Sequence, residues 1–242
     1  MFAPPSATSP FRVGAAFRRA LRIFAAGFGK FFLLGLLPLL ALAAVAAAAA
    51  FVPEGQRAWL EAPWALLQLT LGGLASGACV IGADEIAEGG RFSLSGALRA
   101  AAGDIAAITA VTVIGGALIA LAASFFIVPA FIVMAVTYVA LPARILERRG
   151  PIAALERSGS LTNGRKWRVF GLILATWAFG AMILSAPALF AIVGVLEHSD
   201  WEALVGLGLT MAGASTLQAF TAVASAVAHG DLAAARPVPP AP

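Results

Sequence analysis

The chain has 242 residues, of which 61% are apolar and only 12% are charged, and its mean hydropathy is +0.93. A soluble domain usually carries about a quarter charged residues, so this composition excludes an ordinary soluble globular protein and favours a membrane protein. Lys and Arg exceed Asp and Glu by 16 to 12, which gives a net charge of +4. The bases lie beside apolar runs, and this placement favours anionic lipid headgroups over nucleic acid as their partner.

Six long apolar runs without Asp, Glu, Lys, Arg or His predict six transmembrane helices. They cover residues 31–52, 63–83, 105–123, 129–143, 169–196 and 203–228. The first run is too long for the apolar part of a signal peptide, so we expect it to remain as an anchor. The fourth run is the shortest, which leaves open whether the hairpin 105–143 fully crosses the bilayer. The predicted fold is an all-α polytopic membrane protein.

Three shorter segments, each upstream of a pair of spans, have the pattern of amphipathic helices. They cover about 11–28, 91–102 and 151–162, and we expect them to lie in the cytoplasmic interface. Their order predicts a threefold repeat of an amphipathic helix plus a helical hairpin, with chance similarity between Ala-rich helices as the alternative. Residues 1–230 would form this membrane domain, and 231–242 would be a disordered, Pro-rich cytoplasmic tail.

The positions of the basic residues predict the orientation. If the N-terminus is cytoplasmic, all Lys and Arg residues except Arg57 fall on the cytoplasmic side, whereas the outer loops carry mostly Asp and Glu. Basic residues on short loops are retained in the cytoplasm, so we expect both termini to be cytoplasmic. Nine of these cations form a predicted lipid-facing or partner-facing set, here called the basic collar: Arg18, Arg19, Arg22, Arg148, Arg149, Arg157, Arg165, Lys166 and Arg168.

Neutral polar residues recur within the predicted membrane region. The sixth run carries Ser215, Gln218, Thr221 and Ser225 on one side, and the second run carries Gln68. These five residues, here called the polar stripe, should face the bundle because lipid does not satisfy polar groups. Gln68 is the candidate partner of Gln218. An interhelical hydrogen bond and a substrate-lined cavity both remain open as roles for the stripe.

Small residues at helical spacing indicate close helix packing. The pairs Gly73 with Gly77 and Gly116 with Ala120 remove side-chain bulk from one side of a helix, which lets a neighbouring helix approach.

Residues of the kinds that perform catalysis are few and scattered. His198 lies in a predicted outer loop with Asp200, and His229 lies near the inner end of the sixth span with Asp231. Asp104 is expected to cap the helix that follows it. The single cysteine excludes an internal disulfide and a Cys-rich metal site. We predict no catalytic, cofactor-binding or metal-binding site, and therefore no enzyme.

A resemblance to a known family is carried by residues 141–170. The matching residues are Leu141-Pro142-Ala143, Glu147, Gly150-Pro151-Ile152, Ala154-Leu155, Arg157-Ser158, Leu161-Thr162, Gly164 and Trp167-Arg168-Val169-Phe170. This pattern resembles the glycerophosphoryl diester phosphodiesterase membrane domain family and its uncharacterised bacterial relatives. Two positions depart from it, Ala130 after Pro129 and Gly159 after Ser158. The resemblance implies a six-helix module of the bacterial inner membrane, which in some relatives is fused to a soluble phosphodiesterase domain.

These observations predict a non-enzymatic membrane module that binds anionic lipid, or that organises or regulates a partner protein or a second copy of itself. The alternative is a transporter or export component for an apolar or lipidic substrate. The polar stripe and the prolines Pro129 and Pro187 within spans favour that alternative. The lack of an ionisable residue in the middle of any predicted span disfavours ion-coupled transport. A lipid enzyme is the third hypothesis.

Overall fold

The computed structural model describes the backbone of residues 11–49 and 51–235, and the side chains of these residues except 46–49 and 54–62. In these ranges all regular elements are α-helices. They are α1 (Val13–Ala26), α2 (Phe28–Ala49), α3 (Glu54–Ala87), α4 (Leu94–Gly103), α5 (Ile105–Phe125), α6 (Ile127–Thr137), α7 (Ala140–Leu146), α8 (Pro151–Thr162), α9 (Lys166–Leu196) and α10 (Asp200–Ala234). The predicted all-α class is confirmed.

Six helical segments of the described chain are long and apolar enough to cross a membrane, as the hydropathy predicts. They are Phe28–Val45, Pro63–Ala87, Ile105–Phe125, Ile127–Leu146, Lys166–Leu196 and Asp200–Ala234. Many large apolar side chains on them are exposed; Leu33, Leu121 and Leu207, for example, are 50% or more exposed. Since water would disfavour so much exposed apolar surface, lipid is the expected surroundings of these segments.

The fourth segment is not one continuous helix. α6 ends at Thr137 and α7 begins only at Ala140, so the run predicted at 129–143 is divided between two helices. The fourth segment begins at Ile127, earlier than the predicted run at 129. It follows Phe126, an extended residue at the end of α5.

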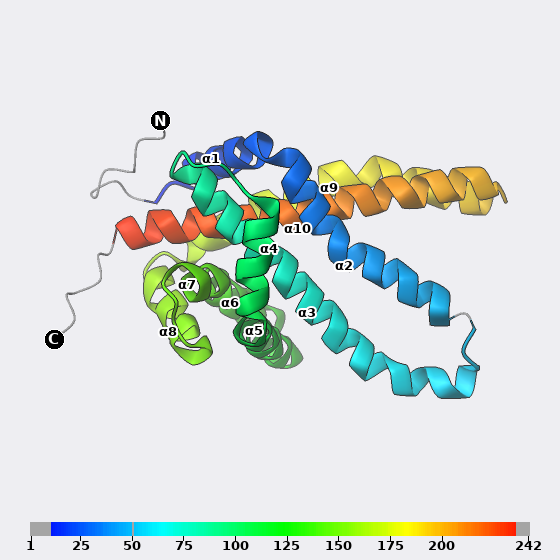
Figure 1. Cartoon of the computed structure of the whole chain (residues 1–242), viewed down its shortest axis with the longest axis horizontal. Helices are drawn as coiled ribbons and strands as arrows, with labels where there is room; N and C mark the ends of the chain where they lie inside the picture. The colour runs from blue at the N-terminus through cyan, green and yellow to red at the C-terminus, as the bar shows by residue number, and fades with distance from the viewer. Residues whose placement is uncertain (1–10, 50, 236–242) are drawn as a thin grey trace.

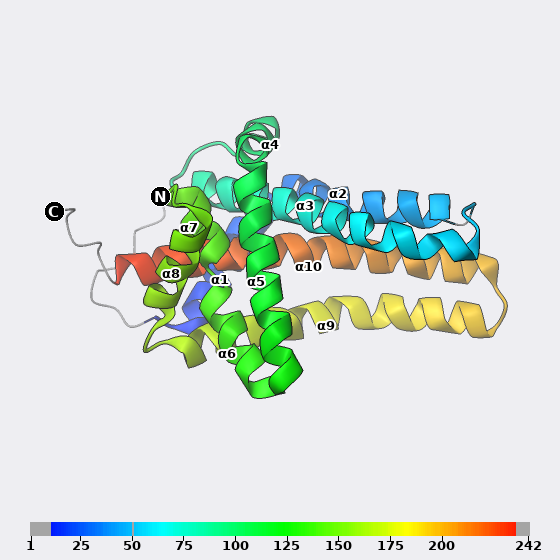
Figure 2. The same cartoon turned by 90° about the horizontal axis from the view of Figure 1, so that it is seen from below.

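Three helical hairpins leave a common hub in different directions. α9 and α10 lie side by side along the molecule, and α2 and α3 diverge from them (Figure 1). α5 runs across the other two hairpins instead of alongside them, and α6 returns beside it (Figure 2). The short helices α1, α7 and α8 and the end of α10 lie at the hub end, opposite the turns of the α2–α3 and α9–α10 hairpins.

The buried core lies in this hub and not along the whole length of the spans. Its centre is an aromatic cluster in which the ring of Phe24 lies 5.7 Å from that of Phe31 and 5.6 Å from that of Phe220, between ring centroids. α10 is buried almost continuously from Ala219 to Leu232. The second half of α10 is therefore the central element that the other helices cover.

Short helices precede the hairpins in the order that the sequence predicts. α1 precedes α2–α3, α4 precedes α5–α6, and α8 precedes α9–α10. α8 begins with Pro151 at its first turn, and Gly164 with φ +76° follows its end. The threefold repeat stays a prediction. The position of the short helices in the membrane interface also stays a prediction.

The C-terminal end of the chain differs from the prediction. α10 continues to Ala234, so the predicted disordered tail does not begin at 231. Helix persists because Asp231 forms an ion pair with Arg19 and because Leu232 is fully buried. The remainder of the predicted tail, 236–242, lies outside the described residues.

Candidate functional site

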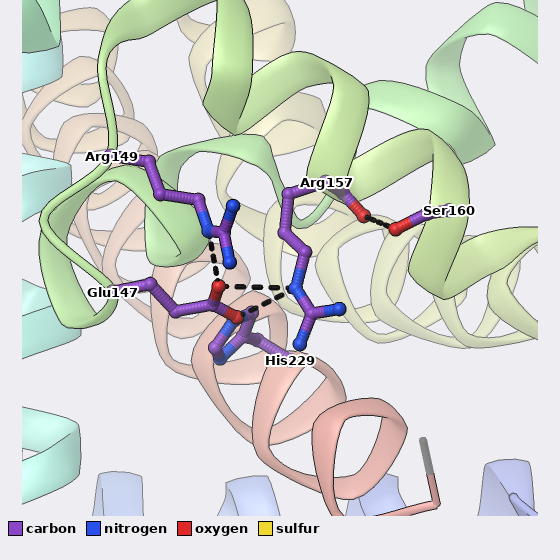
Figure 3. Close-up of polar contacts among 5 residues, drawn as sticks. All are labelled: Glu147, Arg149, Arg157, Ser160 and His229. Atoms are coloured by element: carbon purple, nitrogen blue, oxygen red, sulfur yellow. Dashed lines mark hydrogen bonds and ion pairs between the residues drawn. The ribbon is translucent and has the colours of Figure 1, made fainter. Parts of the chain in front are cut away.

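A cluster of charged side chains joins α7, α8 and α10 at the hub. Glu147 follows the last residue of α7, and the chain then turns sharply at Arg148, whose φ is +50°. The Glu147 carboxylate accepts hydrogen bonds from the Nε atoms of Arg149 and Arg157, the latter at 3.0 Å, and its Oε1 lies 3.0 Å from Nε2 of His229 (Figure 3). Glu147 and His229 are separated by 82 positions in the sequence. The turn after α7 therefore fastens α8 to the central helix.

This cluster is largely withdrawn from solvent. The side chain of His229 is 6% exposed, that of Arg157 13% and that of Glu147 18%. Burial by itself raises the pKa of the Glu147 carboxyl group, but the hydrogen bonds from Arg149, Arg157 and His229 outweigh burial. The net result is a pKa below the usual value near 4.5, so Glu147 is an anion at neutral pH.

Two further ion pairs hold the hub together. Arg19 of α1 pairs with Asp231 of α10, across 212 positions of sequence. Arg144 of α7 donates to Asp104 at 2.9 Å. The prediction that Asp104 caps α5 is wrong, because its side chain accepts no hydrogen bond from the first turn of that helix. Its carboxylate is turned toward Arg144, which can form a charge-assisted hydrogen bond.

The basic collar separates into inward and outward members. Arg19, Arg149 and Arg157 are bound by carboxylates inside the hub, and Arg165 is partly buried. The exposed members are Arg18, Arg22, Arg148, Lys166 and Arg168. None of these exposed members takes part in an ion pair within the described part of the chain. Sequence alone did not distinguish the two sets, because their partners come from distant helices.

The polar stripe does not act as one unit. Ser215 is buried and donates to the Phe32 carbonyl oxygen of α2 at 2.8 Å. Ser225 is also buried and donates within α10, to the carbonyl oxygen of Ala222. Both hydroxyls are therefore satisfied by backbone, as buried polar groups require.

Gln68 contacts α2 and not Gln218. With its amide oriented to satisfy both groups, its nitrogen donates to the Pro38 carbonyl oxygen at 3.2 Å and its oxygen accepts from the Leu42 nitrogen at 3.1 Å. Pro38 lies inside α2 and has no N–H of its own. The two groups that Gln68 contacts belong to the turn of α2 that follows Pro38, so Gln68 joins α3 to α2 at that turn. Gln68 and Gln218 line the same cavity without a hydrogen bond between them in the structure.

That cavity, here called the lateral cavity, has a volume of about 450 Å³ and lies between α3, α5, the α6–α7 segment, α8 and α10. Its walls are mainly apolar, with polar groups from Gln218, Thr221 and Tyr138. A Cβ atom added at Gly116 would meet nothing within 4 Å, so the predicted close packing at Gly116 is wrong.

The predicted close packing at Gly73 and Gly77 is confirmed. A Cβ atom at Gly73 would lie 3.1 Å from Ile108 Cγ2, and one at Gly77 would lie 3.0 Å from Ile108 Cδ1. α3 and α5 approach each other along this glycine surface.

A second cavity, of about 620 Å³, lies where α1 meets α2 and is here called the elbow cavity. Its lining includes Gly27, Phe28, Gly29 and Lys30 from the α1–α2 junction and Gly90 and Arg91 from the loop before α4. Lys30 and Arg91 lie in different apolar-flanked segments, so their meeting at one cavity is not evident from spacing along the sequence. In both segments a glycine precedes the basic residue, as Gly29-Lys30 and Gly90-Arg91, and this pattern is the one sequence signal for the site.

Among the described residues there is no group of three or more His, Cys, Asp and Glu side chains placed to hold a metal ion. His198 and Asp200 lie at the turn between α9 and α10, whereas His229 and Asp231 lie at the hub. Comparisons with protein-family models, curated proteins and solved structures gave no match for this chain, and the family resemblance therefore stays a prediction.

Proposed function

We propose that the protein is a non-enzymatic membrane module that binds anionic lipid headgroups through the exposed members of the basic collar. The supporting observation is the separation of the collar into two sets. Carboxylates inside the hub form ion pairs with Arg19, Arg149 and Arg157, whereas Arg18, Arg148 and Lys166 keep exposed side chains outside any ion pair in the described structure. An exposed cation beside an anionic membrane surface contributes about 1 kcal/mol of binding free energy.

This proposal includes the orientation that the basic residues predict. The hub would face the cytoplasm, at the inner surface of a bacterial cytoplasmic membrane, and both termini would lie on that side. The short helices α1, α4 and α8 would lie near the headgroups, and each would begin one unit of a threefold repeat. The proposed membership of the glycerophosphoryl diester phosphodiesterase membrane domain family agrees with this arrangement.

Replacement of the exposed cations tests lipid binding. In a variant with Arg18→Gln, Arg148→Gln and Lys166→Gln, we expect at least a tenfold loss of affinity for phosphatidylglycerol added to the purified protein in neutral detergent. The matched control carries Arg18→Lys and Arg148→Lys, which keep the charges. Binding should also weaken as salt is raised. Equal affinity of the glutamine variant and the wild type would refute the proposal.

A protein partner with an acidic surface, or a second copy of the chain, would meet the same exposed cations. Gentle extraction from the native membrane followed by native mass spectrometry distinguishes these outcomes. A subunit that co-purifies with the wild type and is lost from the glutamine variant supports a partner-organising role.

A second candidate function is the transport of an apolar or lipidic substrate, and the lateral cavity supports it. Gln218 lies in its wall, and Gly115 faces open space, since an added Cβ atom there would meet nothing within 4 Å. Gly115→Phe should fill the cavity and stop substrate movement, and Gln218→Leu should weaken it. Gly208→Phe is the matched control, because Gly208 also faces open space but lies outside the cavity lining. Full lipid movement in reconstituted vesicles with Gly115→Phe would exclude this function.

A further inference from the structure

The elbow cavity has a position that suits a lipid headgroup. Phe28 is the first residue of the α2 span, and Ile86 lies one residue before the end of the α3 span. Both residues line the cavity. The cavity therefore lies at the level where two apolar spans end, which is where headgroups meet the hydrocarbon core of a bilayer.

Its charges favour an anion. Lys30 and Arg91 line the cavity, and its described lining contains no carboxylate. The nearby Glu85 carboxylate accepts a hydrogen bond from the Ser93 backbone nitrogen at 3.0 Å and does not line the cavity. Arg91 is exposed and belongs to none of the ion pairs of the described residues.

Lys30 is held in place before any ligand arrives. Its ammonium group donates to the Phe92 carbonyl oxygen and lies 5.3 Å from the centroid of the Phe92 ring. The Phe92 ring is itself stacked on Phe31, with 4.8 Å between ring centroids. An ammonium group has three N–H donors, so the contact with Phe92 leaves donors for an anion. A positioned cation loses less conformational entropy on binding than a mobile one.

The walls fit the rest of a lipid molecule. Glycine at 29 leaves the backbone open to close approach, since an added Cβ atom there would meet nothing within 4 Å. Phe28 is 49% exposed and Leu33, further along α2, is 55% exposed. Apolar surface thus continues from the cavity along the membrane-spanning part of α2.

From these observations we infer that the elbow cavity binds the phosphodiester group of one anionic glycerophospholipid, with Lys30 and Arg91 as its ligands. Arg91 can donate two parallel hydrogen bonds to the phosphate oxygens, and Lys30 contributes a fixed positive charge. The acyl chains lie against Phe28 and the exposed side of α2. This inference rests on the proposed lipid binding and adds to it a specific site outside the basic collar.

The test counts lipid molecules that stay bound to the protein, using native mass spectrometry in neutral detergent with phosphatidylglycerol as the probe. We expect one tightly held lipid per wild-type chain and at least a tenfold lower occupancy in Arg91→Gln. Arg99→Gln is the matched control, because Arg99 is an exposed cation of α4 that does not line the cavity. Its occupancy should equal that of the wild type.

A steric variant keeps the charges and fills the space. Gly29→Phe should lower the occupancy as strongly as Arg91→Gln, whereas Gly14→Phe should not. Gly14 is also in open space but lies in α1, outside the cavity lining. A thermal unfolding midpoint equal to that of the wild type confirms that Gly29→Phe remains folded. Retention of the tightly held lipid by both Arg91→Gln and Gly29→Phe would overturn the inference.

The outcomes separate this site from the collar. If the collar glutamine variant loses lipid while Arg91→Gln and Gly29→Phe keep it, the elbow site is wrong and the proposed function stands. If all of these variants keep lipid, both are wrong. Inorganic phosphate serves as the second probe. Binding of phosphate with no binding of phosphatidylglycerol at the same site would overturn the assignment to a lipid.

Discussion

Replacement of Glu147 by glutamine is the sharpest test of how the hub is held together. The substitution keeps the size of the side chain but removes the negative charge that two arginines and His229 share. It also places an NH₂ group where one carboxylate oxygen accepted hydrogen bonds from Arg149 and Arg157. At least one guanidinium group is then left without its acceptor, close to the central helix.

The expected cost follows from the burial of these groups. A hydrogen bond to a charged group contributes about 1.5–3 kcal/mol, and this cluster is partly and not fully withdrawn from solvent. We therefore expect Glu147→Gln to lower the free energy of unfolding by about 2 kcal/mol. In a chain of this length that corresponds to a fall of roughly 4–8 °C in the unfolding midpoint. Glu156→Gln is the matched control, because Glu156 is an exposed residue of α8, and it should change stability by less than about 0.5 kcal/mol.

The same carboxylate makes stability depend on pH. The pKa of Glu147 is lower in the folded protein than its usual value near 4.5, so the unfolded chain binds the proton more readily. The stabilisation is fully present above pH 4.5 and is lost as pH falls through the lower pKa of the folded state. The facing groups are Arg149, Arg157 and His229. Stability of the wild type should therefore decrease in acid more steeply than that of Glu147→Gln, by at most about 1.4 kcal/mol per pH unit.

The chain contains a convenient reporter for this measurement. Cys79 is its only cysteine and is 1% exposed in α3, so a thiol-reactive dye labels it when the protein unfolds. The dye records the unfolding of the wild type, Glu147→Gln and Glu156→Gln in detergent at pH 7, where the reactive thiolate forms. Circular dichroism records the same unfolding curves between pH 7 and about pH 2, the range in which a carboxylate of lowered pKa takes up its proton. Parallel wild-type and Glu147→Gln curves over this range, or equal midpoints at pH 7, would refute the role assigned to Glu147.

Two further predictions concern the spans. Gly35→Ala should lower the free energy of unfolding by about 2 kcal/mol, because its Cβ atom would lie 2.8 Å from Ser215 Oγ and closer still to the Ser215 backbone. Gly14→Ala, in open space, should not destabilise the protein, and equal midpoints for these two alanine variants in the dye assay would contradict the α2–α10 contact. Gln68→Leu should cost about 1–2 kcal/mol through its two lost hydrogen bonds to α2, at Pro38 and one turn later. If Gln68→Leu unfolds at the wild-type midpoint, Gln68 does not support α2.

The sequence predicted the helices because their causes are local. An apolar segment in lipid must satisfy its backbone internally, so each long uncharged run indicates a helix wherever the run stands in the fold. The start of α8 followed equally local signals, with Gly150 and Pro151 at its beginning. Gly73 and Gly77 were also identified correctly, because small residues one turn apart remove side-chain bulk from one side of the helix.

The elements of the candidate sites were harder to predict because their causes are not local. Gly116 has the same spacing signal as Gly73, yet Gly116 faces a cavity. Asp104 stands where a capping residue is expected, but Arg144 from α7 provides a stronger partner for its charge. Lys30 of α2 and Arg91 of the loop before α4 both line the elbow cavity, although they lie far apart in the sequence. None of these outcomes can be read from spacing along one segment.

The sequence by itself determined that the chain is helical and has six segments long and apolar enough to cross a membrane, because backbone satisfaction and hydropathy act within each segment. Only the tertiary structure decided that the hairpins leave the hub in different directions and that the collar divides into paired and exposed cations. Arg19 and Asp231 are 212 positions apart, so their pairing depends on how α1 packs against α10. Charge attraction falls with distance, and only the packing of the helices sets which charges are near.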